Sequence, residues 1–96
     1  MIDSTLKNAK ILIVDDKEAN IDILEGLLEE TGYRNVQSTT DPRMVVDLFK
    51  SFNPDLILLD LMMPYLSGFE VMAEIHSIAP PQSYLPILII TADITP

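Results

Sequence analysis

The chain has 96 residues, 48% of them apolar and none of them cysteine. This length and apolar content predict one small globular domain, and the lack of cysteine excludes a disulfide framework and a thiolate metal site. The formal net charge of -9 argues against direct binding of nucleic acid, because the chain would repel phosphates.

The first half of the chain alternates between short apolar runs and helical patterns. Residues 11–14 form a β-branched run that is typical of a buried strand, and the run ends at Asp15. A helical pattern follows, and Gly32 is expected to end it. The apolar face of this predicted helix consists of Ile21, Leu24 and Leu28, with Leu27 beside them. Residues 36–39 are polar and alternating, which favours a strand at the edge of a sheet.

A second helix and a second buried strand are predicted next. Asp41 is placed to cap the helix, because Pro42 follows at its first position. The apolar positions of that helix are Val45, Leu48, Phe49 and Phe52. Residues 56–59 then form a continuous apolar run, which ends on Asp60.

The last predicted elements are a third helix and a fourth strand. Ser67 and Glu70 have the spacing of a capping box at the start of the helix. Its inner face is predicted to contain Phe69, Met72 and Ile75, and the prolines at 80 and 81 end it. Residues 87–89 are predicted to lie inside a third buried strand, which ends at positions 90 and 91.

The order β-α-β-α-β-α-β predicts an α/β fold, a parallel sheet with helices on both faces. The chain stops at Thr95 and Pro96, a pair that is typical of a helix start, so we expect a truncated piece of a longer domain. No apolar run approaches the ~20 residues of a membrane span, and residues 1–10 are unlike a signal peptide. We therefore expect a cytoplasmic domain that does not contact a membrane.

Three aspartates stand at the carboxyl ends of predicted strands. Asp15 and Asp16 follow the first strand and Asp60 follows the third. If these strands are neighbours, the carboxylates converge in the crevice where parallel sheets bind ligands, and a divalent cation would relieve their repulsion. Oxygen ligands of this kind favour Mg²⁺. The alternative for each aspartate alone is an ordinary loop cap or a solvated side chain.

A carboxylate beside Mg²⁺ can act as a nucleophile toward a phosphoryl group. Asp60 stands alone at its strand end and is the better nucleophile, whereas Asp15 and Asp16 are better placed to hold the metal. The backbone carbonyl of Met62 could complete the metal site. The hydroxyl of Thr91 could bond a phosphoryl oxygen, although taken alone Thr91 is an ordinary strand residue. His76 is expected on a helix surface.

Four segments together resemble the receiver domain of bacterial two-component response regulators. They are the run 11–16 (ILIVDD), the run 56–64 (LILLDLMMP), the run 67–70 (SGFE) and the run 90–92 (ITA). The likeness covers almost the whole chain, from Lys10 to Pro96. It implies a flavodoxin-like sheet with strand order 2-1-3-4-5.

The resemblance also implies a role for each residue of the site. Asp60 would be phosphorylated by a histidine kinase or a phosphotransfer protein. Asp15, Asp16, Asp60 and the Met62 carbonyl would bind Mg²⁺, and Thr91 would be the switch hydroxyl. Asn20 resembles an asparagine that often follows the acidic pair, without an assigned role.

The sequence departs from the family after its fourth strand. The family carries a phosphoryl-contacting lysine on a fifth strand, whereas this chain has no lysine after Lys50. Four strands and three helices of an expected five and five are predicted, so residues 1–96 would be the N-terminal portion of a receiver. The fifth strand and the last two helices would be absent, and an output domain could lie beyond Pro96.

Two other functions compete with a phosphorylated receiver that is not itself a turnover enzyme. One is a degenerate receiver that serves only as a docking or dimerisation module and forms a homodimer through an exposed fourth strand. The other is a free-standing Mg²⁺-dependent phosphatase, which is disfavoured because no separate general acid is visible.

Overall fold

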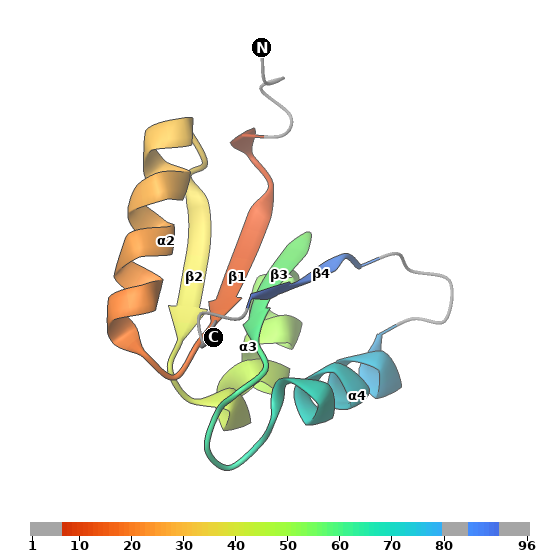
Figure 1. Cartoon of the computed structure of the whole chain (residues 1–96). Coiled ribbons are helices and arrows are strands. Elements are labelled where there is room, and N and C mark those ends of the chain that lie inside the picture. Colours follow the sequence, from red (N-terminus) through yellow and green to blue (C-terminus); the bar gives the residue numbers. More distant parts are fainter. Residues whose placement is uncertain (1–6, 80–84, 91–96) are drawn as a thin grey trace.

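The structure, a computed structural model, describes residues 7–79 and 85–90. In that part, strands alternate with helices along the chain (Figure 1). The strands are β1 (Lys10–Val14), β2 (Asn35–Thr39), β3 (Leu56–Asp60) and β4 (Ile87–Ile90). The α-helices are α2 (Glu18–Thr31), α3 (Val45–Phe52) and α4 (Gly68–Ile78), and a 3-10 turn, η1 (Pro42–Met44), leads into α3. Thr91 and the pair Thr95-Pro96 lie outside the described residues.

The four strands form one sheet in the order β2-β1-β3-β4, and every pair of neighbours is parallel. This confirms the predicted α/β class and the flavodoxin-like order as far as the fourth strand. The polar strand β2 lies at the edge of the described sheet, as its sequence predicted. The register pairs Val14 with Leu59, so the carboxyl ends of β1 and β3 lie side by side.

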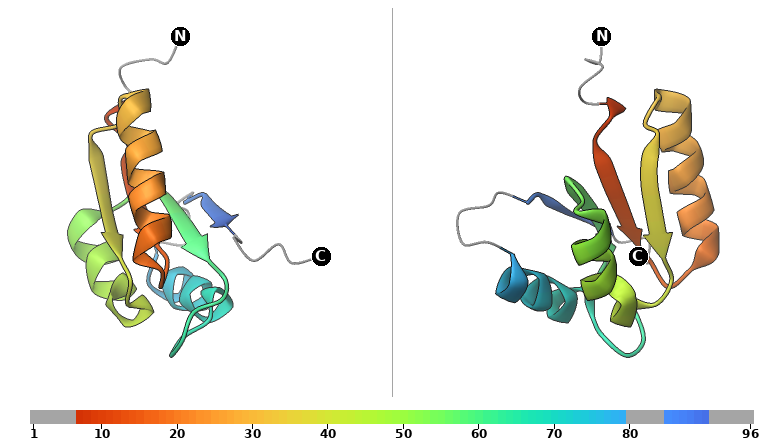
Figure 2. Two further views of the ribbon diagram at one scale, coloured as in Figure 1. Left: turned by 60° about the vertical axis from the view of Figure 1, so that its left-hand side comes forward. Right: turned by 180° about the vertical axis from the view of Figure 1, so that it is seen from behind.

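Helices cover both faces of the sheet (Figure 2). Alternate side chains of the central strands supply a core on each face. On one face, Leu12 and Leu59 pack with residues of α3 and α4. On the other face, Ile13 and Leu58 pack against Ile21 of α2. Because both faces of β1 and β3 are buried, each strand is a continuous apolar run.

The predicted helix caps are present. The Asp41 carboxylate accepts a hydrogen bond from the Arg43 N–H, although the turn that it caps is η1 rather than the first turn of α3. Ser67 and Glu70 form both hydrogen bonds of the capping box. Gly32 ends α2 with a φ of 103°, and Lys7 packs so closely that a Cβ on Gly32 would lie 3.2 Å from its Cδ.

Phe69 was predicted on the inner face of its helix and Leu27 beside the apolar face of its own, and both are exposed. Leu27 is 56% exposed and Phe69 is 65% exposed. In α4 the buried positions are Gly68, Val71 and Ile75, which share one helical face, and Phe69 lies one residue off that face. The capping box and the close approach of Gly68 to β3 set this orientation, so the predicted inner face of α4 was wrong at Phe69.

The predicted strand over residues 87–89 is present as part of β4, but the prediction that it is buried was wrong at Leu88 and Ile89. Leu88 is 56% exposed and Ile89 is 36% exposed. In the described part of the chain β4 is the last strand of the sheet, and on the α2 face only Ile90 of this strand packs against the core. No helix among the described residues is long and apolar enough to cross a membrane.

Candidate functional site

Three carboxylates meet at the carboxyl ends of β1 and β3. Asp15, Asp16 and Asp60 each offer one oxygen, and these oxygens all lie within 4.8 Å of one another, a grouping that could hold a metal ion. We call this group the acidic cluster. The parallel pairing of β1 with β3 brings the three residues together, although 44 residues separate Asp16 from Asp60 in the chain. The predicted convergence is therefore confirmed.

Two neighbouring groups fix the side chain of Asp15, and a third contact holds its backbone. Its Oδ1 accepts a hydrogen bond from the Lys17 N–H at 2.9 Å, and its Oδ2 accepts one from the Asn20 amide at 3.2 Å. Its own N–H donates to the Thr39 carbonyl at the end of β2 at 3.2 Å. With 3% of its surface exposed, Asp15 presents buried carboxylate oxygens in a fixed orientation.

Asp16 contributes an unsatisfied oxygen. Its Oδ1 is buried and has no hydrogen-bond partner within the described part of the chain. An unpaired buried carboxylate oxygen is unfavourable, because it has lost water without gaining a donor. The arrangement fits a cation, which would supply the missing partner and reduce the repulsion within the acidic cluster.

Asp60 is 8% exposed and ends β3. Burial raises the pKa of its carboxyl group, and the charges of Asp15 and Asp16 act in the same direction. The Met62 N–H donates a hydrogen bond to Oδ1 of Asp60 at 3.2 Å, and this bond lowers the pKa and offsets part of the rise. The environment of this carboxyl group therefore opposes ionisation when no cation is bound.

The loop after Asp60, residues 61–67, returns closely to β3 at Gly68. The Gly68 N–H donates to the Leu61 carbonyl at 3.0 Å. A Cβ on Gly68 would lie 2.6 Å from the Asp60 carbonyl oxygen and 2.8 Å from the Leu61 Cα. Only glycine allows this approach, so Gly68 closes the loop beside the acidic cluster.

The other predicted site residues have different outcomes. Met62 is 68% exposed, and its backbone N–H donates a hydrogen bond to the Asp60 carboxylate. That the Met62 carbonyl binds a metal ion stays a prediction. Thr91 lies outside the described residues, so its role is not tested. His76 is exposed on α4, as predicted.

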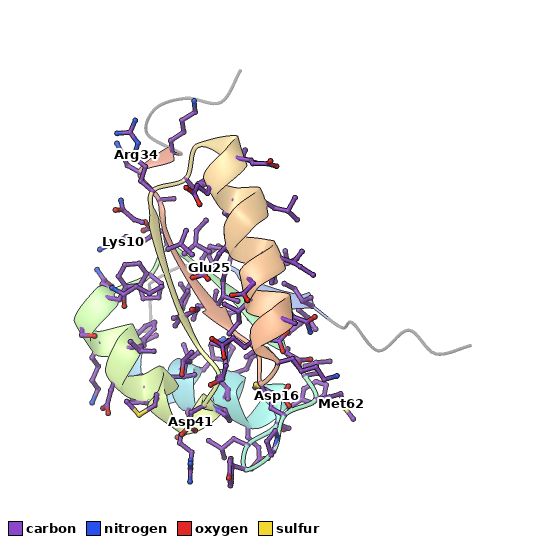
Figure 3. All side chains as sticks on the ribbon, turned by 90° about the vertical axis from the view of Figure 1, so that its left-hand side faces the viewer. Lys10, Asp16, Glu25, Arg34, Asp41 and Met62 are labelled. Carbon is purple, nitrogen blue, oxygen red and sulfur yellow. The ribbon has the colours of Figure 1, made fainter. Side chains whose placement is uncertain are left out.

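The acidic cluster includes residues from β3 and the loop after β1, and it lies at the opposite end of the molecule from Arg34 (Figure 3).

Two residues that support the acidic cluster were not assigned a function from the sequence. Asn20 orients Asp15 through its side-chain amide. Its spacing of five residues from Asp15, just inside a helix start, was the available signal. Gly68 had no distinguishing signal beyond its place in the capping box, because its role depends on contact with β3.

One cavity in the described part of the chain lies away from the acidic cluster. A cavity of about 650 Å³ lies at the far end of α2, lined by charged residues that include Lys7, Glu29 and Arg34. The acidic cluster is recognised by its converging, largely buried carboxylate oxygens. Charged groups that converge at strand ends are the stronger functional indication in a parallel sheet.

Comparisons with known proteins all point to the same family. The response regulator receiver domain family matches residues 11–96. The chain is 39% identical over 87 residues to the transcriptional regulatory protein YvrH of Bacillus subtilis (strain 168), covering 91% of this chain and 35% of YvrH. It is 41% identical over 83 residues to the response regulator MprA of Mycolicibacterium vanbaalenii, covering 86% of this chain and 34% of MprA. The chain thus spans about a third of the length of these curated relatives.

Solved structures agree with the fold. The chemotaxis response regulator CheY4 of Vibrio cholerae superposes with a TM-score of 0.80 at 28% identity, over 93% of this chain and 72% of that chain. The N-terminal domain of a response regulator receiver protein from Methanoculleus marisnigri JR1 gives a TM-score of 0.78 at 31% identity, over 92% of this chain and 71% of that chain.

Proposed function

The chain belongs to the response regulator receiver domain family, and on that premise we propose that it is a phosphoacceptor domain phosphorylated on Asp60 in the presence of Mg²⁺. Receiver domains are signalling domains rather than turnover enzymes. The observation that carries the proposal is the meeting of three carboxylate oxygens within 4.8 Å at the ends of β1 and β3. Such a group can hold a hard cation and present one carboxylate as a nucleophile.

The proposed ligands of Mg²⁺ are Asp15, Asp16, Asp60 and the Met62 backbone carbonyl. The buried, unpartnered Oδ1 of Asp16 in the described part supports this set, as does the fixed orientation of Asp15. When bound, the ion would supply positive charge that neutralises the charge of the transferred phosphoryl group.

Asp60 is the proposed nucleophile. A carboxylate oxygen attacks the phosphorus atom of the donor, the bond from phosphorus to the leaving group breaks, and Asp60 becomes an acyl phosphate. The Met62 N–H holds the carboxyl group from one side and fixes its orientation. The pKa of Asp60 is raised in the absence of a cation. The positive charge of a bound ion would favour the ionised carboxylate, which is the form required for attack.

Thr91 is the proposed switch hydroxyl, which would bond the phosphoryl group and move the domain to its signalling state. Its support is the strand register: Ile90, the residue before Thr91, pairs with Asp60. The proposed partners are a histidine kinase or a phosphotransfer protein, and a C-terminal output domain. We place this domain in the cytoplasm and expect no direct contact with nucleic acid or membrane.

We also propose that residues 1–96 are the N-terminal portion of a receiver. This rests on the solved receivers of Vibrio cholerae and Methanoculleus marisnigri, of whose chains 72% and 71% are covered. The proposal predicts a fifth strand with a lysine in the remainder of the full-length protein.

The direct test is phosphorylation of the full-length protein. Incubated with Mg²⁺ and a small acyl phosphate, the wild type should gain the mass of one phosphoryl group, and a chelator should abolish the gain. Asp60→Asn should gain nothing. Asp55→Asn, which removes an exposed carboxylate at the other end of β3, should behave like the wild type. An equal mass gain in Asp60→Asn would refute the assignment.

A second candidate, a docking or dimerisation module, is favoured by the exposure of Leu88 and Ile89 on β4. An apolar strand edge can pair with a second chain. Sedimentation of the unphosphorylated full-length protein would show a concentration-dependent dimer that Leu88→Lys weakens. A monomer at every concentration would contradict this candidate.

A further inference from the structure

The guanidinium group of Arg43 lies over the ring of Tyr65, with its Cζ 4.0 Å from the ring centroid. Arg43 belongs to η1, which follows β2, and Tyr65 belongs to the loop 61–67 between β3 and α4. The contact joins the segment after the edge strand to the loop that begins directly after Asp60. A planar cation stacked on an aromatic face is an attractive and orientation-dependent pair.

The position of Arg43 is set by Asp41. The Nε of Arg43 donates to Oδ1 of Asp41 at 3.0 Å, and its Nη2 donates to Oδ2 at 3.0 Å. Asp41 in turn is held by Thr39, because its N–H donates to the Thr39 hydroxyl at 3.0 Å. The carbonyl of the same threonine accepts the N–H of Asp15. A continuous set of contacts therefore runs from the acidic cluster to the face of the Tyr65 ring.

The backbone of Tyr65 needs such support. Its φ is 71°, a left-handed conformation that is unfavourable for a residue with a Cβ. The Leu66 N–H donates to the Pro64 carbonyl at 2.8 Å, so Tyr65 is the centre of a three-residue turn. A turn of this kind with positive φ at its centre is the rare, strained form of the γ-turn. The contact of its ring with Arg43 is a side-chain interaction that can help to hold this conformation.

This turn lies between two contacts beside the end of β3. On one side, the Met62 N–H donates to Asp60 at 3.2 Å. On the other side, the Gly68 N–H donates to the Leu61 carbonyl. Because both ends of the loop are held beside the end of β3, a change of backbone conformation at Tyr65 can reach Met62 and its contact with the Asp60 carboxyl group.

We propose that Arg43 and Tyr65 are positioning residues for Mg²⁺ binding, which hold the loop 61–67 so that the Met62 backbone stays against the Asp60 carboxyl group. This inference rests on the proposed function for the identity of the ligand. The two side chains act through the loop backbone. The ring, rather than the tyrosine hydroxyl, carries the effect, because it is the ring face that Arg43 contacts.

Calorimetric titration of the full-length, unphosphorylated protein with Mg²⁺ tests this inference. Tyr65→Leu, Arg43→Gln and Arg43→Lys should each raise the dissociation constant about tenfold, at the low end of the effect of groups that orient metal ligands. Tyr65→Phe should keep the wild-type value, since it keeps the ring. The double variant Tyr65→Leu/Arg43→Gln should be no weaker than either single variant, because one contact is lost in every case.

Two comparisons separate positioning from general stability. Phe69→Leu removes an exposed ring of α4, and its dissociation constant should equal that of the wild type. Arg43 has a 57% exposed side chain, so its variants should fold even if a Tyr65 variant does not. The temperature is chosen so that circular dichroism shows each variant to be folded.

Failure of the inference and failure of the proposed function give different results. If the wild type binds Mg²⁺ and both Tyr65→Leu and Arg43→Gln bind within about twofold of it, the positioning role is wrong and the proposed function stands. If the wild type shows no Mg²⁺ binding that depends on Asp60, the proposed function is wrong and the positioning role falls with it.

Discussion

The carboxyl group of Asp60 lies among groups that favour its neutral form. Burial raises its pKa from the ordinary value near 3.8, and Asp15 and Asp16 add repulsion. A group whose pKa is raised in the folded state stabilises the fold while it is protonated. That stabilisation is fully present below the unfolded pKa and is lost as the pH rises through the folded pKa. At neutral pH without a cation, ionised Asp60 therefore lowers the free energy of unfolding.

Asp60→Asn should accordingly raise the melting temperature at neutral pH in the presence of a chelator. A relief of ~1 kcal/mol would raise it by roughly 4–8 °C in a domain of this size. The difference from the wild type should vanish near pH 3, where the carboxyl group is neutral. Thermal unfolding followed by circular dichroism at the two pH values measures this. Asp55→Asn is the matched control, and a lower melting temperature of Asp60→Asn at neutral pH would contradict the account.

Gly68 can also be tested as a single residue. A Cβ there would lie 2.6 Å from the Asp60 carbonyl oxygen, so Gly68→Ala should cost ~1–3 kcal/mol of unfolding free energy as the backbone shifts. Gly26→Ala in α2 is the control, because a Cβ there meets nothing within 4 Å. That control should be stabilised by ~0.5–1 kcal/mol. Urea unfolding compares the two, and a neutral or stabilised Gly68→Ala would show that the loop is not tightly closed.

At the scale of elements, the sequence predicted every strand and α-helix of the described part. Each of the three helices had an apolar face, and the buried strands were continuous apolar runs. A capping box marked the start of α4, and Asp41 marked the turn η1 that leads into α3. Exposure was predicted less well. Phe69 lies about 100° around α4 from the buried Gly68, a difference that apolar periodicity does not resolve. Leu88 and Ile89 were misjudged because an apolar run does not indicate whether a helix covers it.

The capping box of α4 gives a prediction at this scale. Ser67 accepts the Glu70 N–H at 3.2 Å, and Glu70 accepts the Ser67 N–H at 3.0 Å. Ser67→Ala removes the first hydrogen bond and should cost ~1 kcal/mol of unfolding free energy. Ser77→Ala near the other end of α4 should change stability by less than ~0.5 kcal/mol, because Ser77 is exposed and bonds only within its own helix. Equal losses in the two variants would contradict the capping role.

At the scale of the whole molecule, parallel pairing produces the site. The sequence placed Asp15, Asp16 and Asp60 at strand ends, and the neighbouring positions of β1 and β3 bring them together. Asn20, Gly68 and the Arg43–Tyr65 contact could not be predicted in the same way. Their roles come from the paths of loops, which depend on three-dimensional packing rather than on periodicity.

The net charge of -9 provides a prediction for the folded molecule. Mg²⁺ at ten times its dissociation constant should raise the unfolding free energy by ~1.4 kcal/mol through binding to the folded state. Sodium chloride at equal ionic strength should give a smaller increase, because it only screens the surface charges. In Asp16→Asn, the two salts should raise the unfolding free energy by the same amount. If both salts stabilised the wild type equally, Mg²⁺ would act only by screening surface charge, and a specific site would be contradicted.

The most direct test of the central claim is the chemical location of the phosphoryl group. The full-length protein is phosphorylated with Mg²⁺ and an acyl phosphate and then reduced with borohydride, which converts an aspartyl phosphate to homoserine. Peptide mass spectrometry should find homoserine at position 60 in the wild type, and none at this position when Mg²⁺ is omitted. Homoserine at Asp15 or Asp16 instead, or phosphorylation that proceeds equally without Mg²⁺, would contradict the account.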